Sequence, residues 1–145
     1  MRLGDIMSEA IDTIATTAGL DEAHQKMKQQ DIRHLLVTLG GAVVGVVSAR
    51  DLERAKQGGR SVGDVMSSPL VTAEPRTNVR DAANLLRGHR IGCLPIFEEG
   101  RPVGMVTVSD LLDLIGKGVE RAPAGSQRWD KKHHGAKKRE YTLER

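Results

Sequence analysis

The chain contains the stretch Gly104-Met105-Val106-Thr107-Val108-Ser109-Asp110, and its counterpart Gly45-Val46-Val47-Ser48-Ala49-Arg50-Asp51 lies 59 positions earlier. Both have a glycine, aliphatic residues, a hydroxyl residue and, three positions after the hydroxyl, an aspartate. A short apolar run that ends in Ser or Thr and continues into helix-favouring sequence predicts a buried strand followed directly by a helix. We therefore expect the same strand-to-helix junction twice.

These two stretches close a longer internal repeat. At the same offset, residues 3–57 align with residues 62–116 without a gap, and Gly4-Asp5-Ile6-Met7-Ser8 falls on Gly63-Asp64-Val65-Met66-Ser67. A register kept over this length indicates a duplicated unit. The expected organisation is a first domain at 1–57, a polar linker at 58–61, a second domain at 62–116 and a tail at 117–145.

Each repeat is predicted to fold in the order β-α-β-β-α, which gives the fold class α/β. Apolar residues at steps of three and four predict helices at 20–30 and around 79–86. Glycine-containing turns at 40–41 and 98–100 separate apolar runs and predict a hairpin in each repeat. Opening strands are expected at 11–14 and 70–73, and closing helices near Asp51 and Asp110. One repeat offers little apolar surface, so the two should pack sheet to sheet about a pseudo-twofold.

Composition restricts the class of protein. The 145 residues include one cysteine, Cys93, which excludes an internal disulfide framework and fits a reducing, cytoplasmic location. No apolar run approaches the roughly 18 to 20 residues needed to span a bilayer. The formal net charge of +3 belongs to the tail, because residues 117–145 hold nine Lys and Arg against four Asp and Glu. Its low apolar content predicts a flexible linker followed by an exposed basic arm.

The junctions have two chemical interpretations. The first turn of a helix has unpaired N–H groups that suit a phosphate, and a Ser or Thr hydroxyl beside it can donate to a phosphate oxygen. An aspartate in that turn can accept from two neighbouring ribose hydroxyls. Alternatively, Ser48 and Asp51, like Thr107 and Asp110, are ordinary helix-capping residues.

The duplicated unit resembles a tandem pair of cystathionine-β-synthase (CBS) domains, a Bateman module, over residues 1–116. The resemblance rests on the Gly-Asp-hydrophobic-Met opening and the Gly-hydrophobic-hydrophobic-Ser/Thr-x-x-Asp closing of both repeats. It implies an adenosine ligand, AMP, ADP, ATP or S-adenosylmethionine, in two pockets that each use both repeats. It also implies a homodimer and a regulated effector protein.

The resemblance assigns residues to each pocket. In the first pocket, phosphate and ribose are expected at Arg33, His34, Ser48 and Asp51, with adenine near Met66, Val71, Thr72, Ile91 and Gly92. In the second pocket, Thr107 and Asp110 take the polar role, with adenine near Met7, Asp12, Thr13 and Ile32. Because the second repeat has Gly92-Cys93 in place of Arg33-His34, the first pocket should hold phosphate more tightly. The alternative for Arg33 and His34 is a solvated strand end.

No pattern indicates an enzyme or a metal site. The histidines lack ligand spacing, the cysteine lacks a catalytic context, and no phosphate-binding glycine loop occurs. We expect a stand-alone regulatory module that senses an adenine nucleotide and dimerises through an aliphatic helix face such as Leu111, Leu112, Leu114 and Ile115. The alternative is a dimeric scaffold whose basic tail, with Trp129 and Tyr141, binds nucleic acid or an acidic partner.

Overall fold

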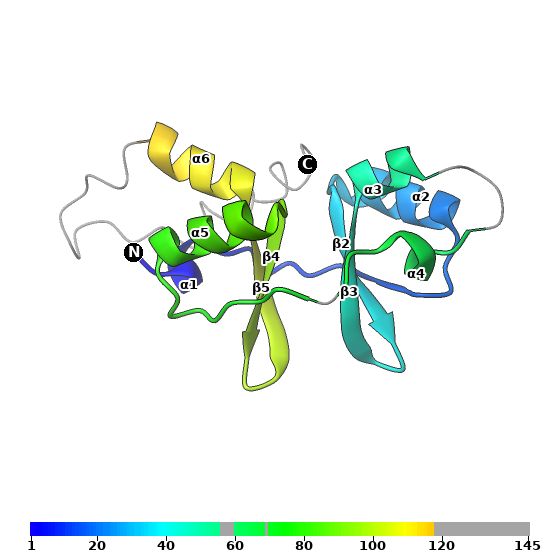
Figure 1. Cartoon of the computed structure of the whole chain (residues 1–145), viewed down its shortest axis with the longest axis horizontal. Helices are drawn as coiled ribbons and strands as arrows, with labels where there is room; N and C mark the ends of the chain where they lie inside the picture. The colour runs from blue at the N-terminus through cyan, green and yellow to red at the C-terminus, as the bar shows by residue number, and fades with distance from the viewer. Residues whose placement is uncertain (56–59, 69, 118–145) are drawn as a thin grey trace. The chain divides into compact units, whose positions relative to one another are not determined.

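A computed structural model describes residues 1–55, 60–68 and 70–117 (Figure 1). The chain divides into two compact units. Within the described residues, unit 1 contains 1–10 and 71–117, and unit 2 contains 11–55, 60–68 and 70. The tail beyond residue 117, with Trp129 and Tyr141, lies outside the described residues, as do linker residues 58 and 59.

Unit 2 is built on a three-stranded sheet of order β1-β2-β3, in which β1 is parallel to β2 and β2 is antiparallel to β3. The helix α2 packs against β2 and α3, and the one-turn helix α4 packs against β1 and β3. The bounds are β1 Thr13–Ala15, α2 Leu20–Gln30, β2 His34–Leu39, β3 Ala42–Ser48, α3 Ala49–Arg54 and α4 Val62–Val65.

Unit 1 is built on one antiparallel pair, β4 with β5. The helices α5 and α6 contact each other, α5 packs on β4, and the one-turn helix α1 packs on β5. The bounds are α1 Leu3–Ile6, α5 Val79–His89, β4 Cys93–Glu98, β5 Arg101–Thr107 and α6 Val108–Gly116. The predicted helices and hairpins are thus confirmed in both repeats.

Both hairpins turn through two residues with positive φ, the feature that type I′ turns require. Gly40 and Gly41 have φ values of 60° and 83°, and Glu99 and Gly100 have values of 50° and 76°. The second turn is one residue shorter than predicted, because Glu98 pairs with Arg101 and belongs to β4.

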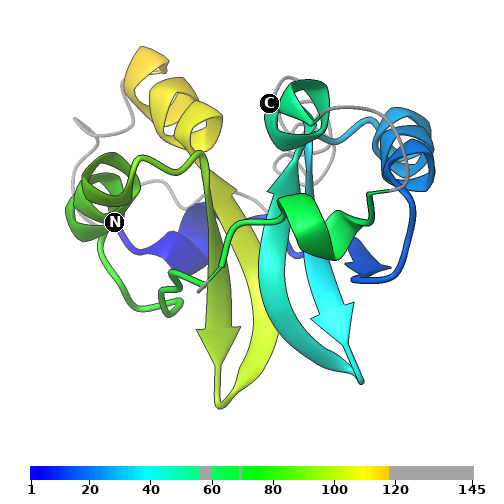
Figure 2. The same cartoon turned by 45° about the vertical axis from the view of Figure 1, so that its right-hand side comes forward.

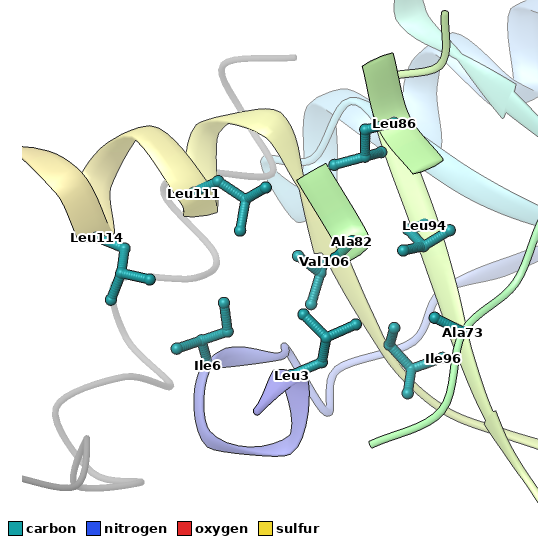
Figure 3. Packing of buried hydrophobic residues seen from close by; sticks show 10 residues of the cluster. All are labelled: Leu3, Ile6, Ala73, Ala82, Leu86, Leu94, Ile96, Val106, Leu111 and Leu114. Atoms are coloured by element: carbon teal, nitrogen blue, oxygen red, sulfur yellow. The ribbon is translucent and has the colours of Figure 1, made fainter. Parts of the chain in front are cut away.

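The opening segments of the two repeats are exchanged between the units. Leu3 and Ile6, from the first repeat, lie in one hydrophobic cluster with Val106 and Leu111 of the second (Figure 3). Val62, from the second repeat, lies in the cluster formed by residues of the first. Each core therefore contains side chains from both repeats, although the repeats are continuous in sequence.

The opening strand of the second repeat is reduced to one bridge, which differs from the strand predicted at 70–73. Ala73 N–H donates to the Pro95 carbonyl (3.1 Å), and the Ala73 carbonyl accepts from Phe97 N–H (2.8 Å). In the first repeat the ladder continues, because Thr16 N–H donates to the Thr38 carbonyl (3.0 Å). The equivalent of Thr16 is Pro75, which has no N–H to donate, so pairing stops after Ala73. Pairing of residues 70–72 is lost for a matching reason: in the first repeat Leu36 N–H donates to the Asp12 carbonyl (3.0 Å), and the equivalent of Leu36 is Pro95.

Candidate functional site

The junction between β3 and α3 is a reciprocal capping box. Ser48 N–H donates to Oδ2 of Asp51 (2.9 Å), and Asp51 N–H donates to Oγ of Ser48 (3.0 Å). Both residues are half-buried. Figure 2 shows α3 continuing from the end of β3, so the cap fixes where strand becomes helix. This geometry satisfies the capping interpretation, and a carboxylate bonded through Oδ2 has a second oxygen able to accept from a ribose hydroxyl.

The junction between β5 and α6 has the same box, but it is more deeply buried. Thr107 N–H donates to Oδ2 of Asp110 (2.9 Å), and the Thr107 hydroxyl donates to the same oxygen (3.0 Å). Thr107 is fully buried and Asp110 is 7% exposed. The two junctions share a sequence pattern but differ in how much of the hydroxyl and carboxylate a ligand can reach.

Arg33 and His34 lie at the same end of the sheet as Ser48. The Arg33 carbonyl accepts from Ala49 N–H (2.9 Å), and His34 is the Cα partner of Ser48 in the β2–β3 ladder. The structure thus brings together the four residues assigned to phosphate and ribose in the first pocket. His34 is buried, so the alternative interpretation of these two residues as a solvated strand end can apply to Arg33 alone.

Arg33 also forms an ion pair with α3. Its Nη2 lies 3.8 Å from Oε1 of Glu53, and the two side chains are 34% and 65% exposed. The guanidinium is therefore held beside α3, two residues beyond Asp51, a contact that no motif in the sequence predicted.

The opening methionine of each repeat packs on the closing glycine of the other. A Cβ placed on Gly45 would lie 2.6 Å from Sδ of Met66 and 2.8 Å from the Ser67 carbonyl oxygen. At Gly104, the corresponding distances are 2.6 Å to Met7 and 2.8 Å to Ser8. Glycine is required at both positions by close approach, which explains why these residue types recur at the ends of the repeats.

The remaining predicted residues divide between the units. Met66, Asp12, Thr13 and Ile32 lie in unit 2 with Ser48 and Asp51, whereas Met7, Val71, Thr72, Ile91 and Gly92 lie in unit 1 with Thr107 and Asp110. Gly92 repeats the contact of Arg33, since its carbonyl accepts from Val108 N–H (3.1 Å). Ile32 is buried in the core of unit 2, where its side chain packs among apolar neighbours.

The aliphatic face predicted on α6 is divided by the fold. Leu111 and Leu114 point into the core of unit 1 and are buried, so they are unavailable for an interface. Leu112 and Ile115 are 62% and 60% exposed, and Val108 joins them at 40%. Their spacing of four and three residues places Val108, Leu112 and Ile115 on one face, here called the α6 stripe.

The described residues contain neither a candidate metal centre nor a candidate membrane-spanning helix. Within residues 1–55, 60–68 and 70–117, no group of three or more His, Cys, Asp or Glu side chains is placed to hold a metal ion. None of the helices in that part of the chain has the length and apolar character needed to cross a bilayer.

The sequence matches a known family model twice. The model is described as "CBS domain", and it matches residues 3–58 and 62–117. The CBS domain-containing protein YhcV of Bacillus subtilis is 30% identical over 112 residues, which cover 74% of this chain and 80% of YhcV. Other relatives are much longer than this chain. A homoserine O-acetyltransferase from Methanohalophilus mahii is 28% identical over 83% of this chain, and the matched region is 26% of that enzyme's length.

Solved structures share the fold. The CBS domain pair of protein MJ0100, solved with 5′-methylthioadenosine and S-adenosyl-L-methionine, aligns with a TM-score of 0.76 and 25% identity. The alignment covers 81% of this chain and 98% of that one. CBSX2 in complex with AMP aligns with a TM-score of 0.69 and 25% identity, over 83% and 98% of the two chains.

Proposed function

The chain belongs to the CBS domain family, and on that premise we propose that it is a regulatory module that binds an adenosine ligand and signals to a partner protein. The observation that carries the proposal is the half-buried Ser48–Asp51 pair with Arg33 beside it. Structures of two similar proteins contain AMP, or S-adenosylmethionine with methylthioadenosine. ADP and ATP share the same adenosine and remain candidates.

Each side chain has a chemical role in this proposal. Asp51 accepts from the ribose hydroxyls, the Ser48 hydroxyl donates to a phosphate oxygen, and Arg33 offers the fork of donors that phosphate binds bidentately. Of the residues assigned to adenine in the first pocket, Met66 lies in the same unit as Ser48 and Asp51. The buried Thr107–Asp110 pair, with Gly92 in place of Arg33, supports a weaker site or a ligand of lower charge.

Signalling requires that the ligand bind two states of the protein with different affinity. The proposal includes a homodimer through the α6 stripe, because three exposed aliphatic side chains on one helix face favour burial against a second copy. Leu112→Glu should convert the dimer to a monomer in sedimentation velocity, and Ser109→Glu, on another face of α6, should leave it a dimer. A wild-type monomer at micromolar concentration would remove this part of the proposal.

The proposal is for a binding module in the cytoplasm and not for an enzyme. The chain covers about a quarter of the homoserine O-acetyltransferase relative, so that enzyme's activity is not assigned to it. A cytoplasmic location rests on the single cysteine.

Calorimetric titration with AMP, ADP, ATP and S-adenosylmethionine tests the ligand. Asp51→Asn should abolish the response, since an amide has a single acceptor oxygen, whereas the carboxylate has one oxygen for Ser48 N–H and a second for the ribose. Asp64→Asn is the matched control: Asp64 closes a capping box on α4 of the same unit and has no assigned ligand role. Equal loss of binding in both variants would show that capping, and not ligand contact, explains the result.

A further inference from the structure

The ion pair between Arg33 and Glu53 suggests how one unit distinguishes ligands by charge. Arg33 is fixed by its backbone to the first residue of α3, through the 2.9 Å hydrogen bond from Ala49. Its guanidinium meets Glu53 at 3.8 Å, with Glu53 largely exposed. The group proposed to bind phosphate is therefore already beside an anion of the protein itself.

This ion pair is weak enough for a ligand to displace. Exposed pairs shift an equilibrium by about fivefold or less, because solvent screens both charges. A phosphate dianion carries twice the charge of a carboxylate and offers two oxygens to the guanidinium fork. The carboxylate of S-adenosylmethionine offers Arg33 the same kind of anion as Glu53, and 5′-methylthioadenosine offers it no anion in exchange.

The internal duplication shows that the fold does not require this pair. At the offset of 59 residues, Arg33 corresponds to Gly92 and Glu53 corresponds to Leu112, so the second repeat lacks both charges together. The capping box beside them is nevertheless retained by Thr107 and Asp110. Leu112 and Glu53, at equivalent positions of the two repeats, are both exposed, so neither side chain contributes to core packing.

We propose that Arg33 and Glu53 form a charge filter in unit 2, in which Glu53 holds Arg33 in the unliganded protein and only a ligand bearing a phosphate dianion displaces it. This inference rests on the proposed function, since it names the ligand class of that site. Unit 1, which has neither charge, shows no such preference.

The experiment compares AMP with 5′-methylthioadenosine, which has the same adenosine and no phosphate. Glu53→Gln should tighten AMP about threefold, because the competing anion is removed, and should leave methylthioadenosine affinity unchanged. Arg33→Gln should weaken AMP about tenfold or more. When Arg33→Gln is already present, adding Glu53→Gln should raise AMP affinity by much less than threefold, because there is no guanidinium to release.

Glu22→Gln is the control for the change in net charge. Glu22 is an exposed acid on α2 of the same unit, and its replacement should leave both affinities unchanged. Three results would overturn the charge filter. They are an equal gain in AMP affinity in Glu22→Gln, an equal gain in methylthioadenosine affinity in Glu53→Gln, and a gain in AMP affinity from Glu53→Gln that is the same with and without Arg33. Each of those results leaves nucleotide binding itself intact, whereas silence of the wild-type protein toward both ligands would overturn the proposed function as well.

Discussion

Replacing Leu3 by alanine is expected to destabilise the core around the second repeat and not the core of its own repeat. Leu3 is fully buried in unit 1 (Figure 3). The change removes three carbons, about 2.4 kcal/mol at ~0.8 kcal/mol for each, and leaves a cavity that adds to the cost. We expect unit 1 to lose about 3 kcal/mol.

The equivalent change in unit 2 is Val62→Ala, which removes two carbons from a fully buried side chain. The transfer cost alone is about 1.6 kcal/mol, and we expect about 2 kcal/mol in total. Leu112→Ala makes the same chemical change as Leu3→Ala on an exposed side chain, and should cost less than about 0.5 kcal/mol.

Native-state hydrogen exchange resolves where the stability is lost. A loss of 3 kcal/mol accelerates exchange about a hundredfold, since every 1.4 kcal/mol is a factor of ten. Leu3→Ala should accelerate the amides of β4 and β5, and Val62→Ala those of β2 and β3. Faster hydrogen exchange in β2 and β3 for Leu3→Ala would refute the conclusion that each opening segment packs in the core of the other repeat. Equal acceleration of both hairpins by either variant would refute the conclusion that the two cores are separate.

Two further predictions concern the motif glycine and an acidic cap. Gly45→Ala should lower the free energy of unfolding by about 1 to 3 kcal/mol in chemical denaturation, because its Cβ would meet the Ser67 carbonyl oxygen at 2.8 Å. Gly88→Ala is the control, since Gly88 lies in open space on α5, and it should be neutral or stabilising. Equal losses of stability in the two variants would contradict the packing argument. Hydrogen bonds from the backbone and hydroxyl of Ser61 lower the pKa of Asp64 below its usual 3.8. Because the folded pKa is the lower one, this carboxylate stabilises the fold above about pH 3.8 and the benefit is lost as pH falls through the folded pKa. The Tm difference between wild type and Asp64→Asn should therefore shrink between pH 6 and pH 3, and a difference independent of pH would be inconsistent with the shift.

Local patterns predicted the longer helices and both hairpins, whereas the strand expected at 11–14 is β1 Thr13–Ala15 and the one-turn helices α1 and α4 were not predicted. The helix expected at 20–30 is α2 Leu20–Gln30, because its apolar periodicity is a property of the helix itself. The turn at Gly40-Gly41 follows from the backbone that two glycines allow. Pro95 and Pro75 were visible signals against a full second opening strand, because they replace Leu36 and Thr16, whose N–H groups donate to the ladder in the first repeat.

The exchange of opening segments was not predictable from the pattern. Leu3 and Val62 occupy equivalent positions in two similar repeats, so either one satisfies the apolar pattern of either core. Burial at the site was hidden for the same reason: Ser48-x-x-Asp51 and Thr107-x-x-Asp110 have one pattern, yet only the second pair is buried. Burial depends on residues far apart in the chain, which a motif does not contain.

The most direct test of a sensor for adenosine ligands is calorimetric titration of the purified protein with AMP, ADP, ATP and S-adenosylmethionine at about physiological ionic strength, where nonspecific attraction of anions to the basic tail is screened. We predict saturable micromolar binding of at least one of them, lost in Asp51→Asn and kept in Asp64→Asn. No heat of binding from any of the four ligands, with the protein folded, would contradict the account and leave Ser48 and Asp51 as helix caps alone.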